Sequence, residues 1–272
     1  MIIDTHAHLN FSEFNKDRDL LIKDLIKKDY QIINVGTNIE SSKECVKLAE
    51  KYGFYASVGL HPLNIESSLK IKGEAEKKES VFDYNTYKKL SQSKSVVAIG
   101  EIGLDYWYKP KGKDRRAEFI EKQKAFFINQ IDLAEELNLP LIIHCRMAFN
   151  DLIEILSKRN TKGVIHCFTG TVEQAKELLS LGYYIGINGI IFKMDLKDVI
   201  QFVPIDKILI ETDCPYLSPP DFEERNNPFS LELIAEEIGR IKNISKEEVI
   251  IKTADNAKSI FNLLIPPLTL LK

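Results

Sequence analysis

Short apolar runs alternate with longer amphipathic stretches along the whole chain. The runs are rich in Ile and Val, as expected of parallel strands that are buried on both faces of a sheet. We therefore predict eight strands. In chain order the runs are MIIDT, QIINVG, FYASVGL, VVAIG, PLIIHC, GVIHCF, YYIGING and KILIET.

The stretches between these runs predict helices. They carry an apolar residue near every third or fourth position, and a Gly or Asn stands close to the end of each. The clearest examples are residues 17–28, 41–53, 116–138 and 171–182.

Alternating strands and helices predict an α/β protein with a parallel sheet and right-handed crossovers. Eight units close into a single-domain (β/α)₈ TIM barrel, for which 272 residues is an ordinary length. The alternative is a doubly wound open sheet, but no GxGxxG turn follows the first run. We expect the barrel to occupy residues 1–265, with a C-terminal tail at 266–272. The charged segment 66–80 is expected to be an exposed loop or the start of a helix.

Charge and composition narrow the class of protein. The formal charge is −3, from 37 Lys and Arg against 40 Asp and Glu, so no global basic field exists to hold long nucleic acid. No signal-peptide pattern or membrane-spanning apolar run is visible, and we expect a cytoplasmic protein. The 4 cysteines form no CxxC pair, which fits free thiols in a reducing compartment.

All 5 histidines fall at the ends of predicted strands. Strand carboxyl ends share one face of a barrel, and that face carries the active site. His6 and His8 alternate with Ala7 and so point the same way, as a half-site for a metal ion would require. The histidines are His6, His8, His61, His144 and His166.

Carboxylates stand at the same end of the predicted barrel. Glu101 ends the fourth run, and Glu211 and Asp213 end the eighth. Such a donor set suits Zn²⁺ or Mn²⁺, with Mg²⁺ a weaker match, and two ions bridged by a carboxylate would use all the ligands. The alternative is a set of hydrogen-bonded polar residues without metal, which would leave many buried groups competing for partners.

Three cysteines directly follow these polar residues. Alternation would turn Cys145, Cys167 and Cys214 outward beneath the helices, as small buried apolar side chains. The competing interpretation makes them soft metal ligands, although they would point away from their neighbours' ion.

The motifs together resemble the TatD-like metal-dependent hydrolases, which belong to the amidohydrolase-type barrel superfamily. The resemblance covers Asp4 to Phe261. In order, its motifs are DTHAHL, GLHP, GEIGLDY, LPLIIHCR, GVIHCFTG, ETDCPYLSPP, RNNP and TADNAKSIF.

The resemblance implies a (β/α)₈ barrel that binds two divalent metal ions. His6, His8 and Asp213 would bind one ion, His144 and His166 the other, and Glu101 would bridge them. Members of the family are similar to deoxyribonucleases that release nucleotides from DNA ends, and some act on other substrates. Glu223 and Glu224 depart from the family pattern, because many members carry basic residues before RNNP.

This ligand set predicts hydrolysis by a metal-activated water, with Asp213 and Glu101 as catalytic residues and Asp213 as proton acceptor. We expect His61, Arg146 and Tyr106 to bind substrate. His61 fits a structural role equally well, and Arg146 would either grip phosphate or neutralise carboxylates. The loop DYWYKPKGKDRR offers aromatic and basic side chains to a nucleic-acid end, or is a solvated loop with its aromatics packed inward.

Three functions compete at this point. The first is a metal-dependent deoxyribonuclease, exonuclease-like, acting on single-stranded DNA or DNA ends. The second is a metal-dependent hydrolase of a small-molecule or aminoacyl ester or amide. The third is a metal-binding nucleic-acid module without turnover. The complete ligand set, including a potential base, argues against the third.

Overall fold

A computed structural model describes residues 1–65, 78–220, 222 and 225–263 of the chain. The predicted tail at 266–272, most of the predicted loop at 66–80, and both Glu223 and Glu224 lie outside this part. The tail boundary therefore stays a prediction.

Eight parallel strands follow one another around a single sheet, in the order of the sequence. Each strand overlaps one of the predicted apolar runs, which confirms the (β/α)₈ architecture. The strands are β1 (Ile2–Ala7), β2 (Tyr30–Val35), β3 (Tyr55–Val58), β4 (Val96–Asp105), β5 (Leu141–Arg146), β6 (Gly163–Ile165), β7 (Tyr184–Ile187) and β8 (Ile208–Ile210).

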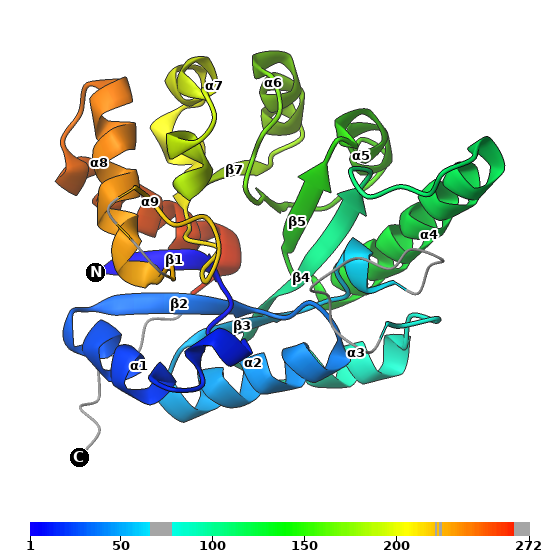
Figure 1. The fold of residues 1–272 in the computed structure, drawn as a ribbon, viewed down its shortest axis with the longest axis horizontal. Helices are drawn as coiled ribbons and strands as arrows, with labels where there is room; N and C mark the ends of the chain where they lie inside the picture. Colours follow the sequence, from blue (N-terminus) through cyan, green and yellow to red (C-terminus); the bar gives the residue numbers. More distant parts are fainter. Residues whose placement is uncertain (66–77, 221, 223–224, 264–272) are drawn as a thin grey trace.

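Helices surround the strands on the outside (Figure 1). The helix expected at 41–53 ends as predicted, with Gly53 in the left-handed conformation, but it begins earlier, because Asn38 caps it with a capping box. The helices are α1 (Arg18–Lys27), α2 (Ile39–Tyr52), α3 (Tyr84–Leu90), α4 (Lys113–Leu137), α5 (Phe149–Leu156), α6 (Val172–Ser180), α7 (Lys197–Phe202), α8 (Leu231–Lys242) and α9 (Lys246–Phe261). Short 3₁₀ turns lie at Ser12–Phe14, Pro62–Asn64, Gly189–Phe192, Ile205–Lys207 and Pro228–Ser230.

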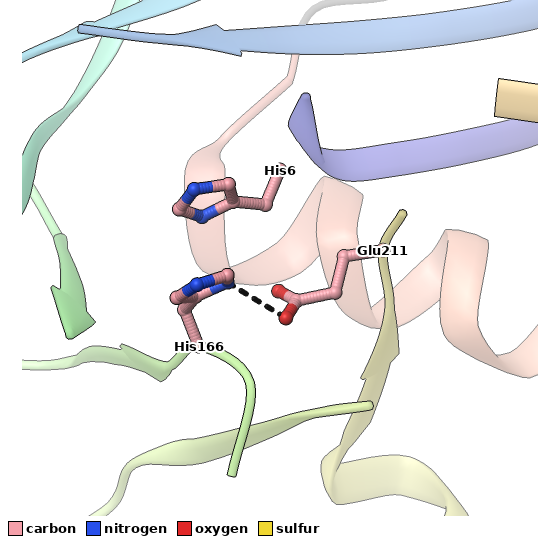
Figure 2. Close-up of side chains that lie close together, drawn as sticks. All are labelled: His6, His166 and Glu211. Carbon is pink, nitrogen blue, oxygen red and sulfur yellow. Dashed lines mark ion pairs between the residues drawn. The ribbon is translucent and has the colours of Figure 1, made fainter. Parts of the chain in front are cut away.

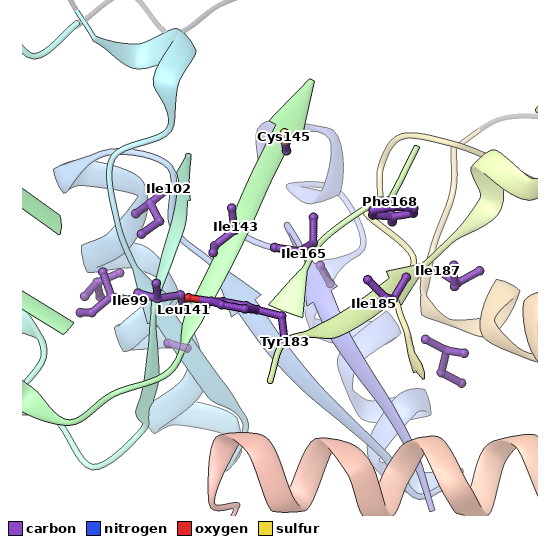
Figure 3. Close-up of a cluster of buried hydrophobic side chains, with 14 of the residues drawn as sticks. Ile99, Ile102, Leu141, Ile143, Cys145, Ile165, Phe168, Tyr183, Ile185 and Ile187 are labelled. Carbon is purple, nitrogen blue, oxygen red and sulfur yellow. The ribbon is translucent and has the colours of Figure 1, made fainter. Parts of the chain in front are cut away.

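The larger apolar core lies between the strands and the helices. Figure 3 shows part of it, with Ile143, Ile165 and Ile185 on three neighbouring strands. Cys145 and Cys214 belong to this layer, which confirms their predicted outward orientation.

A second cluster fills the barrel interior and is covered by α9. Ile142, Val164 and Leu209 pack there with α9 residues such as Phe261. These three strand residues lie two positions before His144, His166 and Glu211, and residues two apart on a strand share a face. The apolar interior layer therefore lies directly beneath the polar residues, and α9 closes the end opposite them.

The barrel closes between β8 and β1 without a regular ladder. One isolated parallel bridge joins Ala7 to Cys214. The buried Asp4 carboxylate supplements it, accepting the backbone N–H of Thr212 at 3.0 Å and its hydroxyl at 2.6 Å. Thr5 adds a bond from its hydroxyl to the carbonyl of Ile210. Side chains thus take over much of the closure that a strand ladder would provide.

Candidate metal centre

Glu101 lies at the centre of the polar cluster, buried in the middle of β4. Its Oε2 atom is 3.4 Å from His6 Nε2 and 3.8 Å from His8 Nε2. Its Oε1 atom is 3.2 Å from His144 Nδ1, 3.4 Å from His61 Nε2 and 3.7 Å from His166 Nε2. The two oxygens of one carboxylate therefore face two different sets of imidazoles.

The first set comes from the two strands at the barrel seam. The Nε2 atoms of His6 and His8 are 3.2 Å apart, as expected for side chains on one face of a strand. Asp213, just beyond β8, places Oδ1 3.3 Å from His8 Nε2 and 3.8 Å from His6 Nε2. Asp213 is held there by its backbone N–H, which donates to the carbonyl of His6 at 2.8 Å.

The second set comes from β5, the end of β6 and the turn after β3. His144 and His166 present one ring nitrogen each to Glu101, and the His61 ring contacts the His144 ring edge-on at 4.5 Å. The β4–β5 register brings Gly103 beside His144. A Cβ on Gly103 would lie 2.0 Å from the His144 carbonyl oxygen, so only glycine allows this close approach.

Three of the rings have a polar partner on the side that faces away from Glu101. The Nδ1 atom of His8 lies 2.9 Å from the Val35 carbonyl and must donate to it, which leaves a lone pair on Nε2. His144 Nε2 lies 3.0 Å from Asp105 Oδ2. His166 Nδ1 lies 2.8 Å from Glu211 Oε1, a close ion-pair contact that Figure 2 shows. In each ring the other nitrogen faces the cluster, where a metal ion would displace any proton that it carries.

His61 has the opposite arrangement. Its Nδ1 atom accepts the backbone N–H of Leu63 at 3.1 Å. The proton of the neutral ring therefore lies on Nε2, which faces Glu101 at 3.4 Å. His61 thus presents an N–H donor to the cluster. Its position would also allow it to bind a metal ion together with Glu101 and His144.

These donors fit divalent metal ions. Metal–nitrogen bonds of about 2.0–2.1 Å imply tetrahedral ligand separations of about 3.3 Å, close to the separations around Glu101. His6 faces Glu101 and Asp213 through Nε2, while its buried Nδ1 has no hydrogen-bond partner among the described residues. Candidate ligand groups in the described chain include His6, His8 and Glu101, and also His6, His166 and Glu211 (Figure 2).

The electrostatics of the cluster favour ionised carboxylates. Burial raises the pKa of Glu101, but His61 and His6 outweigh it and hold that pKa well below its usual range. Asp213 follows the same pattern. Burial raises its pKa, but the contact with His8 and the charges of His166 and His6 outweigh burial, so the pKa lies below its usual value. Both groups are therefore anionic near neutral pH, as metal ligands and proton acceptors must be.

The histidines carry the complementary shifts. Burial lowers the pKa of His144, but Asp105 and Glu101 raise it to about 9. For His166, burial is outweighed by the Glu211 carboxylate and the pKa rises to about 10. Asp105 and Glu211 each support one ring from behind, which orients the ligand and makes it more basic.

The structure brings together all six predicted ligands, His6, His8, Glu101, His144, His166 and Asp213. Sequence reasoning gave no role to Asp105, which is 1% exposed and orients His144. The sequence could have indicated this role, because Asp105 and Glu101 stand four positions apart on one strand and therefore point to the same face.

Two sequence predictions need correction. Tyr106, expected to bind substrate, packs in the core, and its hydroxyl donates to Asp151 at 2.8 Å. Cys167, expected beneath the helices, adopts a positive φ of 45° just after β6, and its thiol contacts Asn188 instead. The exposed aromatics beside Arg146 are Trp107 and Tyr108.

Sequence and structure comparisons indicate the class of protein. The chain is 37% identical to an uncharacterized metal-dependent hydrolase, YabD of Bacillus subtilis, over 97% of this chain and 100% of that protein. Its structure is similar to that of YjjV, a TatD homolog from Escherichia coli, with a TM-score of 0.83, 29% identity, and coverage of 97% of this chain and 98% of the other. These matches place the chain among the metal-dependent hydrolases.

The particular family follows from two further matches. The family model for TatD related DNase matches residues 3–262. The 3'-5' ssDNA/RNA exonuclease TatD of Erwinia tasmaniensis is 32% identical over 96% of this chain and 100% of that protein. The chain belongs to the TatD family. Among the helices in the described ranges, none is both long and apolar enough to cross a membrane.

Proposed function

We propose that this protein hydrolyses phosphodiester bonds at the ends of single-stranded DNA, as a two-metal deoxyribonuclease. The observation that carries the proposal is the orientation of Glu101, whose two oxygens face separate histidine sets. One carboxylate between two ligand sets is the arrangement that a pair of bridged ions requires. The family name and the Erwinia relative support nucleic acid as substrate.

We assign one ion to His6, His8 and Asp213, and the other to His144 and His166, with Glu101 between them. Two divalent ions, Zn²⁺, Mn²⁺ or Mg²⁺, would supply Lewis acidity and acidify water at this site. The imidazole-rich donor set favours Zn²⁺ or Mn²⁺ over Mg²⁺.

The side chains divide the remaining work. Asp213 is ionised and its side chain is 16% exposed, so it can accept a proton from water and return it to solvent. His61 points an Nε2–H group into the cluster and is placed to donate to a phosphate oxygen. Arg146 lies two residues beyond His144 on the same face of β5 and can hold a phosphate through its guanidinium fork.

A time course on oligonucleotides tests the proposal. Single-stranded DNA labelled at its 3′ or 5′ end is incubated with the protein and Mg²⁺, Mn²⁺ or Zn²⁺, with the Asp213→Asn variant as control. Stepwise loss of nucleotides from one end, dependent on Asp213, supports the proposal and fixes the polarity.

The same experiment separates the alternatives. If no ion supports cleavage but a small ester or aminoacyl substrate turns over in an Asp213-dependent way, the protein is a small-molecule hydrolase instead. Binding of DNA without turnover of any substrate would identify a non-catalytic module.

A further inference from the structure

An exposed aromatic surface stands beside the metal cluster, at the ends of β4 and β5. Trp107 is 53% exposed and Tyr108 is 38% exposed. The guanidinium carbon of Arg146 lies 4.5 Å from the Trp107 ring centroid and 5.8 Å from that of Tyr108. We call Trp107, Tyr108 and Arg146 the aromatic platform.

Asp105 fastens this platform to the metal cluster. Its Oδ1 atom accepts the backbone N–H of Trp107 at 2.9 Å, and its Oδ2 atom lies 3.0 Å from His144 Nε2. The Tyr106 backbone N–H also donates to the Arg146 carbonyl at 2.9 Å. A single buried carboxylate therefore sets the distance between the Trp107 backbone and a metal-facing imidazole.

The charge of Arg146 is not neutralised within the described chain. No carboxylate of the described residues forms an ion pair with its guanidinium, and its side chain is exposed. An arginine held against aromatic rings loses less conformational freedom when it binds, and it keeps its fork for an incoming anion. The platform thus combines an anion-binding group with flat apolar surface.

We propose that the aromatic platform is a nucleobase-binding subsite: a base next to the scissile phosphate stacks on Trp107 while its phosphate contacts Arg146. This inference rests on the proposed function and adds to it the form of the substrate. Bases in a duplex are already stacked on their neighbours, so only an unpaired base exposes a face to the indole. The subsite would select frayed or single-stranded ends without reading sequence.

Trp107 is the single tryptophan of the chain, so its fluorescence reports on the platform alone. The binding experiment uses the metal-loaded Asp213→Asn variant, which we expect to bind without cleaving, and a short single-stranded oligodeoxynucleotide. We expect the oligonucleotide to quench the Trp107 emission, and an abasic strand of equal length to leave the emission unchanged.

Substitution gives an independent readout, with affinity measured by anisotropy of a labelled strand in the same background. Trp107→Ala should weaken binding of the intact strand roughly 5- to 150-fold, the range for loss of one stacked base. The abasic strand should lose far less, and Trp107→Phe should restore part of the affinity. The matched control is Phe202→Ala. Phe202 is a 42% exposed ring at the last residue of α7, and it belongs neither to the aromatic platform nor to the metal cluster.

Two results would overturn the proposal: an emission that does not change when the intact strand binds, or an equal loss of affinity for intact and abasic strands in folded Trp107→Ala. Its failure is distinguishable from failure of the proposed function. If the wild type cleaves the strand but neither the Trp107 emission nor the effect of Trp107→Ala depends on the bases, only the subsite proposal is wrong. If the bases quench the Trp107 emission but no ion supports diester cleavage, only the proposed nuclease function is wrong.

Discussion

Glu211 provides the sharpest test of how the cluster holds its ions. Its Oε1 atom accepts the Cys167 backbone N–H at 2.7 Å and the Asn188 side-chain amide at 3.2 Å, and it lies 2.8 Å from His166 Nδ1 in an ion-pair contact. In Glu211→Gln the side chain keeps its size but carries one acceptor oxygen and an amide that only donates. The amide oxygen can take the place of Oε1, but the negative charge that faces His166 is lost. The amide N–H₂ group then takes the place of Oε2, which has no hydrogen-bond partner among the described residues.

The size of the effect follows from this mismatch. An unsatisfied buried donor costs about 1–3 kcal/mol, and the lost negative charge is the one that faces the His166 ring. Removal of such a supporting partner lowers metal affinity by about 10- to 100-fold, which is about 1.4–2.7 kcal/mol at 1.36 kcal/mol per decade. We therefore expect weaker metal binding at the second ion while the barrel stays folded.

Competition with a coloured chelator measures the affinity, and far-ultraviolet circular dichroism checks the fold. Glu154→Gln is the matched control, because Glu154 lies exposed on α5 with Lys158 as its partner and should have no effect on the metal. Wild-type affinity in folded Glu211→Gln would show that Glu211 does not orient a ligand and that our assignment of His166 is wrong.

Three further predictions follow from the same geometry. Asp213→Asn should lower kcat by about 10²- to 10⁴-fold because the amide accepts no proton; steady-state kinetics measure this, and retained activity would exclude Asp213 as the base. His8→Ala should lower the bound metal found by elemental analysis, whereas His61→Ala should keep it and raise KM, because His61 presents a donor; equal metal loss in both would make His61 a ligand. Removal of metal with EDTA should lower Tm by about 5–10 °C, if saturating ions contribute about 2.7 kcal/mol; an unchanged Tm in a scan with and without Zn²⁺ would argue against metal binding to the folded state.

Much of the fold is readable from the chain because buried parallel strands are apolar on both faces. The runs that contain Ile32, Ile143 and Ile185 stand out against polar loops for this reason. The position of the site could be predicted too, because the carboxyl ends of parallel strands lie at one face of the barrel and the histidines stand at those ends.

The orientation of individual side chains beyond the strands was harder to predict. Alternation applies only while the backbone stays extended, and the left-handed turn at Cys167 (φ 45°) breaks it just after β6. Tyr106 was misassigned because composition shows that a loop is aromatic, not which ring packs inward. The role of His61 depends on a backbone N–H that finds its Nδ1 atom, a contact that no residue pattern encodes.

The seam between β8 and β1 gives the active cluster an unusual dependence on the whole polypeptide. His6 and Asp213 come from the first strand and from just beyond the last one, and the nearby bond from Thr5 to Ile210 spans 205 residues. A ribosome-bound chain would display its first histidines long before the aspartate that completes their set exists. Synthesis would thus have to reach the last strand before hydrolysis could begin, so a truncated or nascent product would have no hydrolase activity.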